Sequence, residues 1–117
     1  MQGEMLRIHV LESDRHAGKP LYEAIVARCR EMEMAGATVF RGLEGYGENA
    51  ELHKGHLLHS EAPIIITVVD APEKIERLIP AISELVDTGL LATSPVEMIR
   101  VRQAVSPANP IPPEGPR

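Results

Sequence analysis

Two segments of the chain carry the apolar pattern of β-strands. In residues 5–12, apolar side chains occupy every second position from Leu6 to Val10, which predicts a strand with one buried face. Residues 63–69 are apolar on both faces, as is typical of a central strand that is covered on each side. Weaker patterns predict two further strands, over residues 37–43 and 96–102.

A first helix is predicted between the first two strands. Apolar residues recur at helical spacing from Leu21 to Met32, which indicates a helix with one buried stripe. Pro20 suits the first helical position because its missing N–H would be unpaired there. Gly36 is expected to end the helix in the left-handed conformation.

A second helix is predicted over residues 71–87. Asp70 and Glu73 have the spacing of a capping box, and Gly89 is expected to stop the helix. Pro80 lies inside this stretch, where it removes one backbone hydrogen bond and is expected to bend or loosen the helix.

Two stretches lack periodicity. Residues 44–61 are rich in glycine, histidine and polar side chains and are expected to form a long loop, a kind of segment that often carries function. The proline-rich residues 104–117 are expected to be a disordered tail. We therefore expect one folded domain over residues 1–103.

The order strand, helix, strand, loop, strand, helix, strand predicts an α+β, ferredoxin-like fold, in which two helices cover one face of an antiparallel sheet. The first and third strands are then central. Residues 63–69 are apolar on the face that no helix covers, so we expect another copy of the chain to cover it.

Composition and charge restrict the classes of partner that this protein could bind. A net charge of −5 and the presence of only three aromatic residues argue against nucleic acid or an anionic membrane as the main partner. The longest apolar run is too short to span a bilayer, and the N-terminal residues do not resemble a secretory signal. The single cysteine, Cys29, lies on the helical stripe and is expected to be a buried hydrophobe. We expect a cytoplasmic protein.

A cluster near the end of the second strand is a candidate anion site. Arg41 offers a bidentate fork to a phosphate or carboxylate, and the glycines Gly42, Gly45 and Gly47 would let backbone N–H groups approach an anion. The alternative is that these glycines only permit twisting and flexibility.

Three further cations are candidates. Lys19 lies in the polar connection before the first helix, whose N-terminus favours anions, but the interpretation that we favour is that Lys19 stays solvated while its neighbours hydrogen-bond the turn. Arg100 and Arg102 would share one face of the last strand and could reach a phosphate at a subunit edge. Their alternative role is to protect a sheet edge from strand addition.

Three histidines recur every third residue within residues 44–61, namely His53, His56 and His59. On a helix they would lie roughly on one side and could bind a divalent metal. The alternative is a solvated, pH-sensitive loop. No nucleophile is accompanied by a recognisable catalytic partner, so we expect a binding function rather than an enzyme.

The stretches ESDRHAGKPLYEAIV (12–26) and ATVFRGLEGYG (37–47) resemble the PII-like superfamily, in particular its small bacterial proteins known as domain of unknown function 190. The resemblance covers about residues 5–102. The glycine-rich second phosphate loop of true PII proteins has no counterpart after Thr88 and Gly89.

The resemblance implies a homotrimer with a signalling role that binds an adenine nucleotide in clefts between subunits. Residues 44–61 would correspond to the T-loop, which contacts a partner protein and changes shape on ligand binding. Tyr46, Glu48 and Lys54 are the residues of this loop that we expect to face the partner. A metal-binding trimer that uses the loop histidines is the alternative function.

Overall fold

The central pair of strands follows directly from the apolar pattern. In the computed structural model, which describes residues 1–46, 52–54 and 61–103, β1 (Gln2–Leu11) pairs antiparallel with β7 (Pro63–Asp70). Leu6, Ile8 and Val10 project to the same side of the sheet as Ile64, Ile66 and Val68, and all six are buried. Their burial removes a continuous apolar surface from water, which stabilises this pairing.

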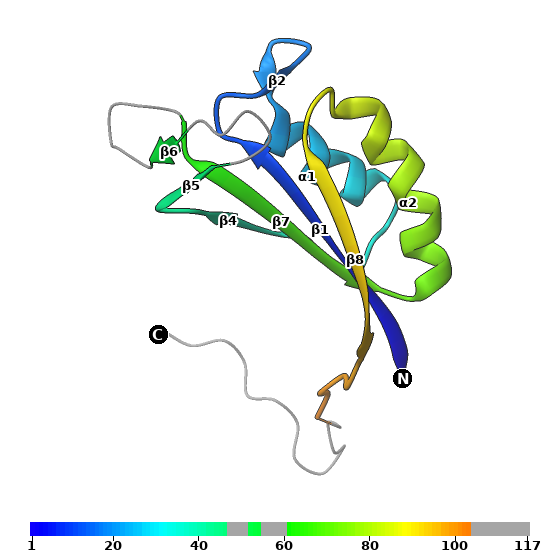
Figure 1. The fold of residues 1–117 in the computed structure, drawn as a ribbon. Coiled ribbons are helices and arrows are strands. Elements are labelled where there is room, and N and C mark those ends of the chain that lie inside the picture. The colour runs from blue at the N-terminus through cyan, green and yellow to red at the C-terminus, as the bar shows by residue number, and fades with distance from the viewer. Residues whose placement is uncertain (47–51, 55–60, 104–117) are drawn as a thin grey trace, which may run out of the picture.

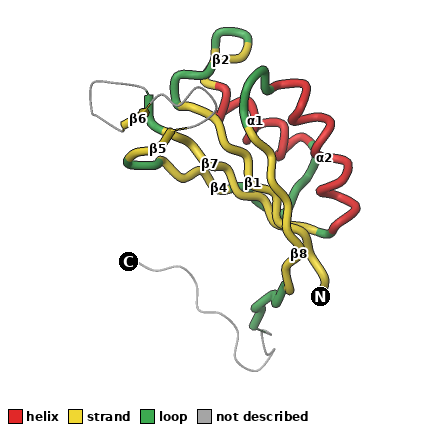
Figure 2. Tube along the Cα trace, viewed as in Figure 1, coloured by secondary structure: helices red, strands yellow, loops and turns green. Residues whose placement is uncertain are grey.

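The outer strands complete an antiparallel sheet in the order β4-β7-β1-β8. Here β4 (Thr38–Arg41) pairs with β7, and β8 (Leu90–Glu97) pairs with β1. Both helices, α1 (Leu21–Glu31) and α2 (Pro72–Leu85), lie on one face of this sheet (Figures 1 and 2). The predicted ferredoxin-like fold, with the first and third major strands at its centre, is confirmed.

The buried stripes of the two helices fill the space above the sheet. They consist of Leu21, Ile25 and Cys29 on α1 and of Ile75, Leu78, Ile82 and Leu85 on α2. The helix α2 continues through Pro80, which lies on its exposed side. No helix of the described residues is long and apolar enough to cross a membrane.

The helix ends differ from the predicted signals. Pro20 is the residue before the first turn of α1, and the left-handed residue after that helix is Glu33 (φ 57°) rather than Gly36. The helix ends earlier because the N–H of Met34 bonds to the carbonyl of Cys29, which closes the last turn ahead of the glycine. Gly89 also lies beyond the end of its helix, and a Cβ there would come within 2.7 Å of the His9 carbonyl oxygen.

Asp70 does not form the predicted capping box, because Ala71 occupies the N-cap position of α2. Its carboxylate accepts hydrogen bonds from the N–H of Ala71 at 2.7 Å and from the N–H of Ala35 at 2.8 Å. The ammonium of Lys74 lies 3.6 Å from the same carboxylate and donates to the Glu33 carbonyl at 2.6 Å. The contacts of Asp70 therefore connect the segment after α1 to the start of α2.

Replacing Asp70 with asparagine is expected to lower the free energy of unfolding by about 1.5–3 kcal/mol at neutral pH, because hydrogen bonds to a charged group are lost. Burial by itself would raise the pKa of Asp70, but the N–H groups of Ala35 and Ala71 and the charge of Lys74 lower it below its ordinary value. A lowered pKa stabilises the fold above the ordinary value of about 3.9, and this contribution is lost as pH falls through the folded pKa.

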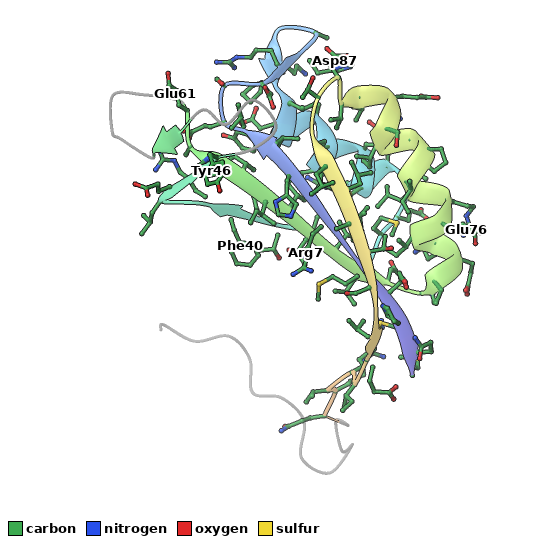
Figure 3. All side chains as sticks on the ribbon, in the orientation of Figure 1. Arg7, Phe40, Tyr46, Glu61, Glu76 and Asp87 are labelled. Carbon is green, nitrogen blue, oxygen red and sulfur yellow. The ribbon has the colours of Figure 1, made fainter. Side chains whose placement is uncertain are left out.

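Urea unfolding of Asp70→Asn and of the wild type between pH 7 and pH 3 measures this effect, with Asp87→Asn as the control at an exposed position (Figure 3). The difference between wild type and Asp70→Asn should shrink towards pH 3. A difference that stays constant over this range would contradict the role of the carboxylate.

The last strand was predicted too late in the chain. It spans Leu90–Glu97, and residues 98–103 have no regular structure. The pairing register explains why β8 ends before residue 98. Leu90 lies opposite His9 and Glu97 lies opposite Gln2, which is the first residue of β1, so residues after Glu97 have no strand to pair with. Arg100 and Arg102 therefore do not lie on a strand, and Ile99 and Val101 beside them are 83% and 87% exposed.

Two short hairpins were not predicted. Arg15–His16 (β2) pairs with Lys19–Pro20 (β3), and the residues between them, Ala17 and Gly18, both have positive φ, as tight two-residue turns require. Glu44–Tyr46 (β5) pairs with Leu52–Lys54 (β6). The expectation that residues 44–61 form a loop without structure of their own is therefore wrong for the strands β5 and β6.

The sheet face opposite the helices is only partly polar. The register places Phe40, Ile65, His9 and Leu90 in one row across all four strands on this face. Phe40 and Leu90, at the two ends of this row, are 54% and 59% exposed. Phe40 and Arg7 point away from the helices (Figure 3). We refer to these four residues as the outer row.

Candidate functional site

The candidate anion cluster forms where β4 ends and β7 begins. Arg41 lies opposite Ile64 at the end of β4. The next residue, Gly42, donates its N–H to the Pro63 carbonyl at 2.7 Å. A Cβ at Gly42 would lie 2.8 Å from the Pro63 ring, and one at Gly45 would lie 3.3 Å from it. Both glycines therefore let the chain pass close to Pro63, and the Gly42 N–H already has a carbonyl partner.

The guanidinium of Arg41 lies against the carboxylate of Glu12. Its Nε donates to one carboxylate oxygen at 3.0 Å and its Nη2 to the other at 3.2 Å. Hydrogen bonding to Glu12 raises the pKa of Arg41 above its ordinary value. This pair connects the end of β1 to the end of β4, and it shows that Arg41 takes up an oxyanion in the bidentate geometry that the sequence suggested.

The hairpin β2–β3 positions Lys19 in front of α1. The carboxylate of Asp14 accepts the Leu11 N–H at 2.8 Å, and the Asp14 carbonyl accepts the Leu21 N–H at 2.8 Å. One N–H of the first turn of α1 is thus already paired. Lys19 itself is exposed.

Arg100 and Arg102 are far from Arg41 in the chain as folded. They follow the end of β8 that lies beside Gln2, whereas Arg41 and Glu12 lie near the opposite end of β1. Gln2 and Leu11 are nine residue steps apart along β1, which corresponds to roughly 30 Å. The structure therefore does not bring the three predicted arginines together within one chain.

The residues predicted for the loop are described only in part. Tyr46 is 75% exposed at the end of β5. His53 and Lys54 lie on β6, so the helical spacing assumed for the three histidines does not hold at His53. Gly47, Glu48, His56 and His59 lie outside the described residues.

Within residues 1–46, 52–54 and 61–103, no group of three histidine, cysteine, aspartate or glutamate side chains is placed to hold a metal ion. Cys29 is buried as predicted, and burial raises the pKa of its thiol. A raised pKa keeps the sulfur protonated, which disfavours a role as a nucleophile or ligand.

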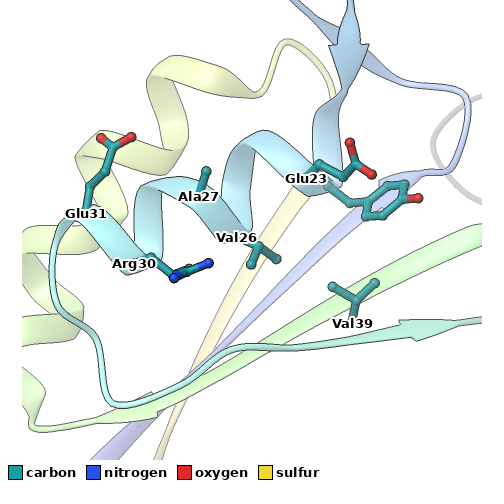
Figure 4. Close-up of a pocket in the computed structure, with 7 residues that line it drawn as sticks. Glu23, Val26, Ala27, Arg30, Glu31 and Val39 are labelled. Atoms are coloured by element: carbon teal, nitrogen blue, oxygen red, sulfur yellow. The ribbon is translucent and has the colours of Figure 1, made fainter.

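A shallow hollow between α1 and β4 was missed by the sequence analysis (Figure 4). Its lining combines apolar and charged side chains, namely Tyr22, Glu23, Val26, Ala27, Arg30, Glu31 and Val39. Val39 lies opposite Ile66 and Arg41 opposite Ile64, so both project to the helix side of β4. Val39, in the lining of this hollow, and Arg41, with its bidentate guanidinium, thus lie two residues apart on one strand. The apolar pattern gave no signal for it, because the exposed flank of α1 lies outside the buried stripe.

Solved structures share this fold. CPII, a nitrogen regulatory PII-like protein from Thiomonas intermedia K12 bound to ADP, AMP and bicarbonate, matches with a TM-score of 0.68 and 17% identity, over 86% of this chain and 91% of that one. A putative PII-like signaling protein from Thermus thermophilus matches with a TM-score of 0.62 and 13% identity, over 82% and 88% of the two chains. The fold is that of PII-like proteins.

Sequence relatives define the family within this class. Residues 3–98 match DUF190, described as "Uncharacterized ACR, COG1993". A UPF0166 protein of Aquifex aeolicus (strain VF5) is 37% identical over 98 residues, which cover 82% of this chain and 92% of that protein. The chain belongs to the DUF190 family, and the resemblance that its motifs indicated is confirmed.

Proposed function

We propose that this chain is a PII-like signalling protein of the cytoplasm that assembles as a homotrimer and binds an adenine nucleotide in the clefts between its subunits. The observation that carries the proposal is the position of the hollow beside Arg41 on one side of β4. A nucleotide combines a flat, largely apolar base with a phosphate group, and the apolar side chains of the hollow and the guanidinium offer a surface for each part.

The outer row supports assembly. Phe40 and Leu90 are large apolar side chains that remain more than half exposed in the single chain, and they continue the apolar surface of Ile65 on the same face. Covering this row with other copies of the chain would remove it from water. Closed symmetry with three copies is the arrangement that we propose.

The separation of the arginines supports a site between subunits. Arg41 lies near one end of the sheet, and Arg100 and Arg102 follow the strand that ends at the other, so they would meet at one phosphate only if different copies supplied them. We propose that the cation set at each cleft combines Arg41 and Lys19 of one copy with Arg100 and Arg102 of the next. The glycines Gly42, Gly45 and Gly47 would frame the same cleft.

The segment that follows this cleft would transmit the signal. We propose that ligand binding changes the arrangement of residues 44–61, with Tyr46, Glu48 and Lys54 facing a partner protein. A ligand shifts such a segment only by as much as its affinity differs between the two arrangements. Tyr46 is exposed at the start of this segment, and a side chain with an apolar ring and a polar end suits a protein interface.

Mixing two inactive variants tests whether the site is shared. Arg41→Gln and the double variant Arg100→Gln, Arg102→Gln are each expected to weaken ADP binding about tenfold or more, because each removes charge-assisted hydrogen bonds to phosphate. Unfolding and refolding them together should yield mixed trimers in which some clefts again contain all three arginines, so that a fraction of sites regains the affinity of the wild type. Isothermal titration calorimetry with ADP measures this fraction.

Refolding each variant alone is the matched control and should restore nothing. If mixed and separate samples bind ADP equally weakly while the wild type binds it tightly, the arginines do not meet between copies. If the wild type binds neither ADP, AMP nor ATP, the nucleotide proposal itself is wrong.

A further inference from the structure

The carboxylate of Glu12 occupies the edge of the guanidinium on which the proposed phosphate site depends. The two contacts, at 3.0 Å and 3.2 Å, engage Nε and Nη2 of Arg41 with both oxygens of one carboxylate. The side chain of Glu12 is 23% exposed and that of Arg41 is 40% exposed. The pair is thus accessible to a ligand but partly shielded from water.

The backbone holds Glu12 in this position independently of its side chain. The Glu12 N–H bonds to the carbonyl of Ala62 at 2.9 Å, and Ala62 is fully buried. On the other side, Arg41 belongs to β4, whose pairing with β7 fixes its register. The carboxylate and the guanidinium therefore face each other across the start of β7.

We propose that Glu12 is a specificity-determining residue of this site, a role that rests on the proposed function. It holds Arg41 when the site is empty, and a phosphoryl group displaces it, whereas a singly charged carboxylate ligand does not. A carboxylate would make the same two hydrogen bonds that Glu12 makes and would also lose its translational freedom on binding. A phosphate group carries nearly two charges and three acceptor oxygens, and these offset that loss.

Removing the charge of Glu12 tests this role. Glu12→Gln keeps the shape of the side chain, and AMP is expected to bind this variant about two- to fivefold more tightly than the wild type, as the loss of one competing partly exposed ion pair implies. Glu76→Gln makes the same change of net charge on an exposed residue of α2 and should leave AMP affinity unchanged. Isothermal titration calorimetry gives the affinities, and thermal unfolding confirms that each variant is folded.

Two further comparisons isolate the pair and its selectivity. In an Arg41→Gln background, the change Glu12→Gln should have no effect on AMP affinity, because the group for which Glu12 competes is gone. Sodium phosphate should compete with AMP in the wild type, whereas sodium acetate at the same ionic strength should compete only in Glu12→Gln.

The outcomes separate the two proposals. If the wild type binds AMP and Glu12→Gln binds it equally or more weakly, the role of Glu12 is wrong while the nucleotide site stands. The same conclusion follows if acetate competes equally in both proteins. If neither protein binds AMP, ADP or ATP, the proposed function fails and the role of Glu12 fails with it.

Discussion

Replacing Phe40 with aspartate is expected to convert the proposed trimer into monomers. Phe40 lies at the end of the outer row, and assembly would bury the new carboxylate in an apolar interface without a partner. An uncompensated buried charge costs about 3–5 kcal/mol, which weakens association by a factor of at least about 100. Sedimentation velocity at micromolar concentration measures the change, and nucleotide affinity should fall with it because the clefts would no longer form.

The control for this variant places the same charge on the other side of the sheet. Thr93 is exposed on β8 and lies opposite Leu6, so it projects to the helix side. Thr93→Asp should leave the mass of the assembly unchanged. A wild type that sediments as a single chain, or a Phe40→Asp variant that remains trimeric, would contradict the proposed assembly through the outer row.

Truncating Ile66 to alanine is expected to destabilise the fold by about 2–5 kcal/mol, because it deletes buried methyl groups and leaves a cavity between the sheet and the helices. Ile66 is fully buried on β7. This loss is a large share of the total stability of a small domain, commonly about 5–15 kcal/mol, and Ile66→Ala should therefore unfold at a clearly lower urea concentration than the wild type.

The neighbouring residue provides a matched comparison. Ile65 is half-buried on the same strand but faces the outer row. Ile65→Ala should lower the free energy of unfolding less than Ile66→Ala under conditions in which both are monomeric, and it should weaken assembly instead. Urea denaturation followed by circular dichroism distinguishes the two, and equal losses would contradict the assignment of the two faces.

The sequence predicted the elements whose position is decided by the burial of their own apolar side chains. The alternation around Leu6 to Val10 and the continuous apolar run of residues 63–69 identified the central strands because burial of apolar surface decides their position. The helical stripes identified α1 and α2 for the same reason. In both cases the local pattern and the final packing favour one structure.

The errors arose where pairing with distant residues decided the outcome. Residues 96–102 contain the β-branched residues Val96, Ile99 and Val101, whereas the true strand contains Pro95, a residue that central strands avoid. Because β8 is an edge strand, Pro95 is tolerated there, and the length of β1 sets the limits of the pairing. Local propensity could not show this.

The sequence singled out Arg41 as a candidate, but it could not indicate which side chain Arg41 contacts. Arg41 stood out because its residue type suits an oxyanion, yet its partner Glu12 lies 29 residues earlier in the chain and became its neighbour only through the strand order. The hollow beside Val39 likewise requires α1 and β4 to be placed next to each other. The residue type indicates which ligand a side chain can bind, whereas the order of the strands and helices decides which side chains lie next to each other.

The link around Asp70 has a mechanical consequence for the whole molecule. It joins the segment after α1 to the first turn of α2, through Ala35, Ala71 and Lys74, and so restrains the two helices against sliding past each other. The two helices are therefore expected to move as one rigid layer behind the sheet. A change in the position of Arg41, at the end of β4, would then have to be accommodated by β4 and β5, because the helices behind the sheet are held in place relative to each other.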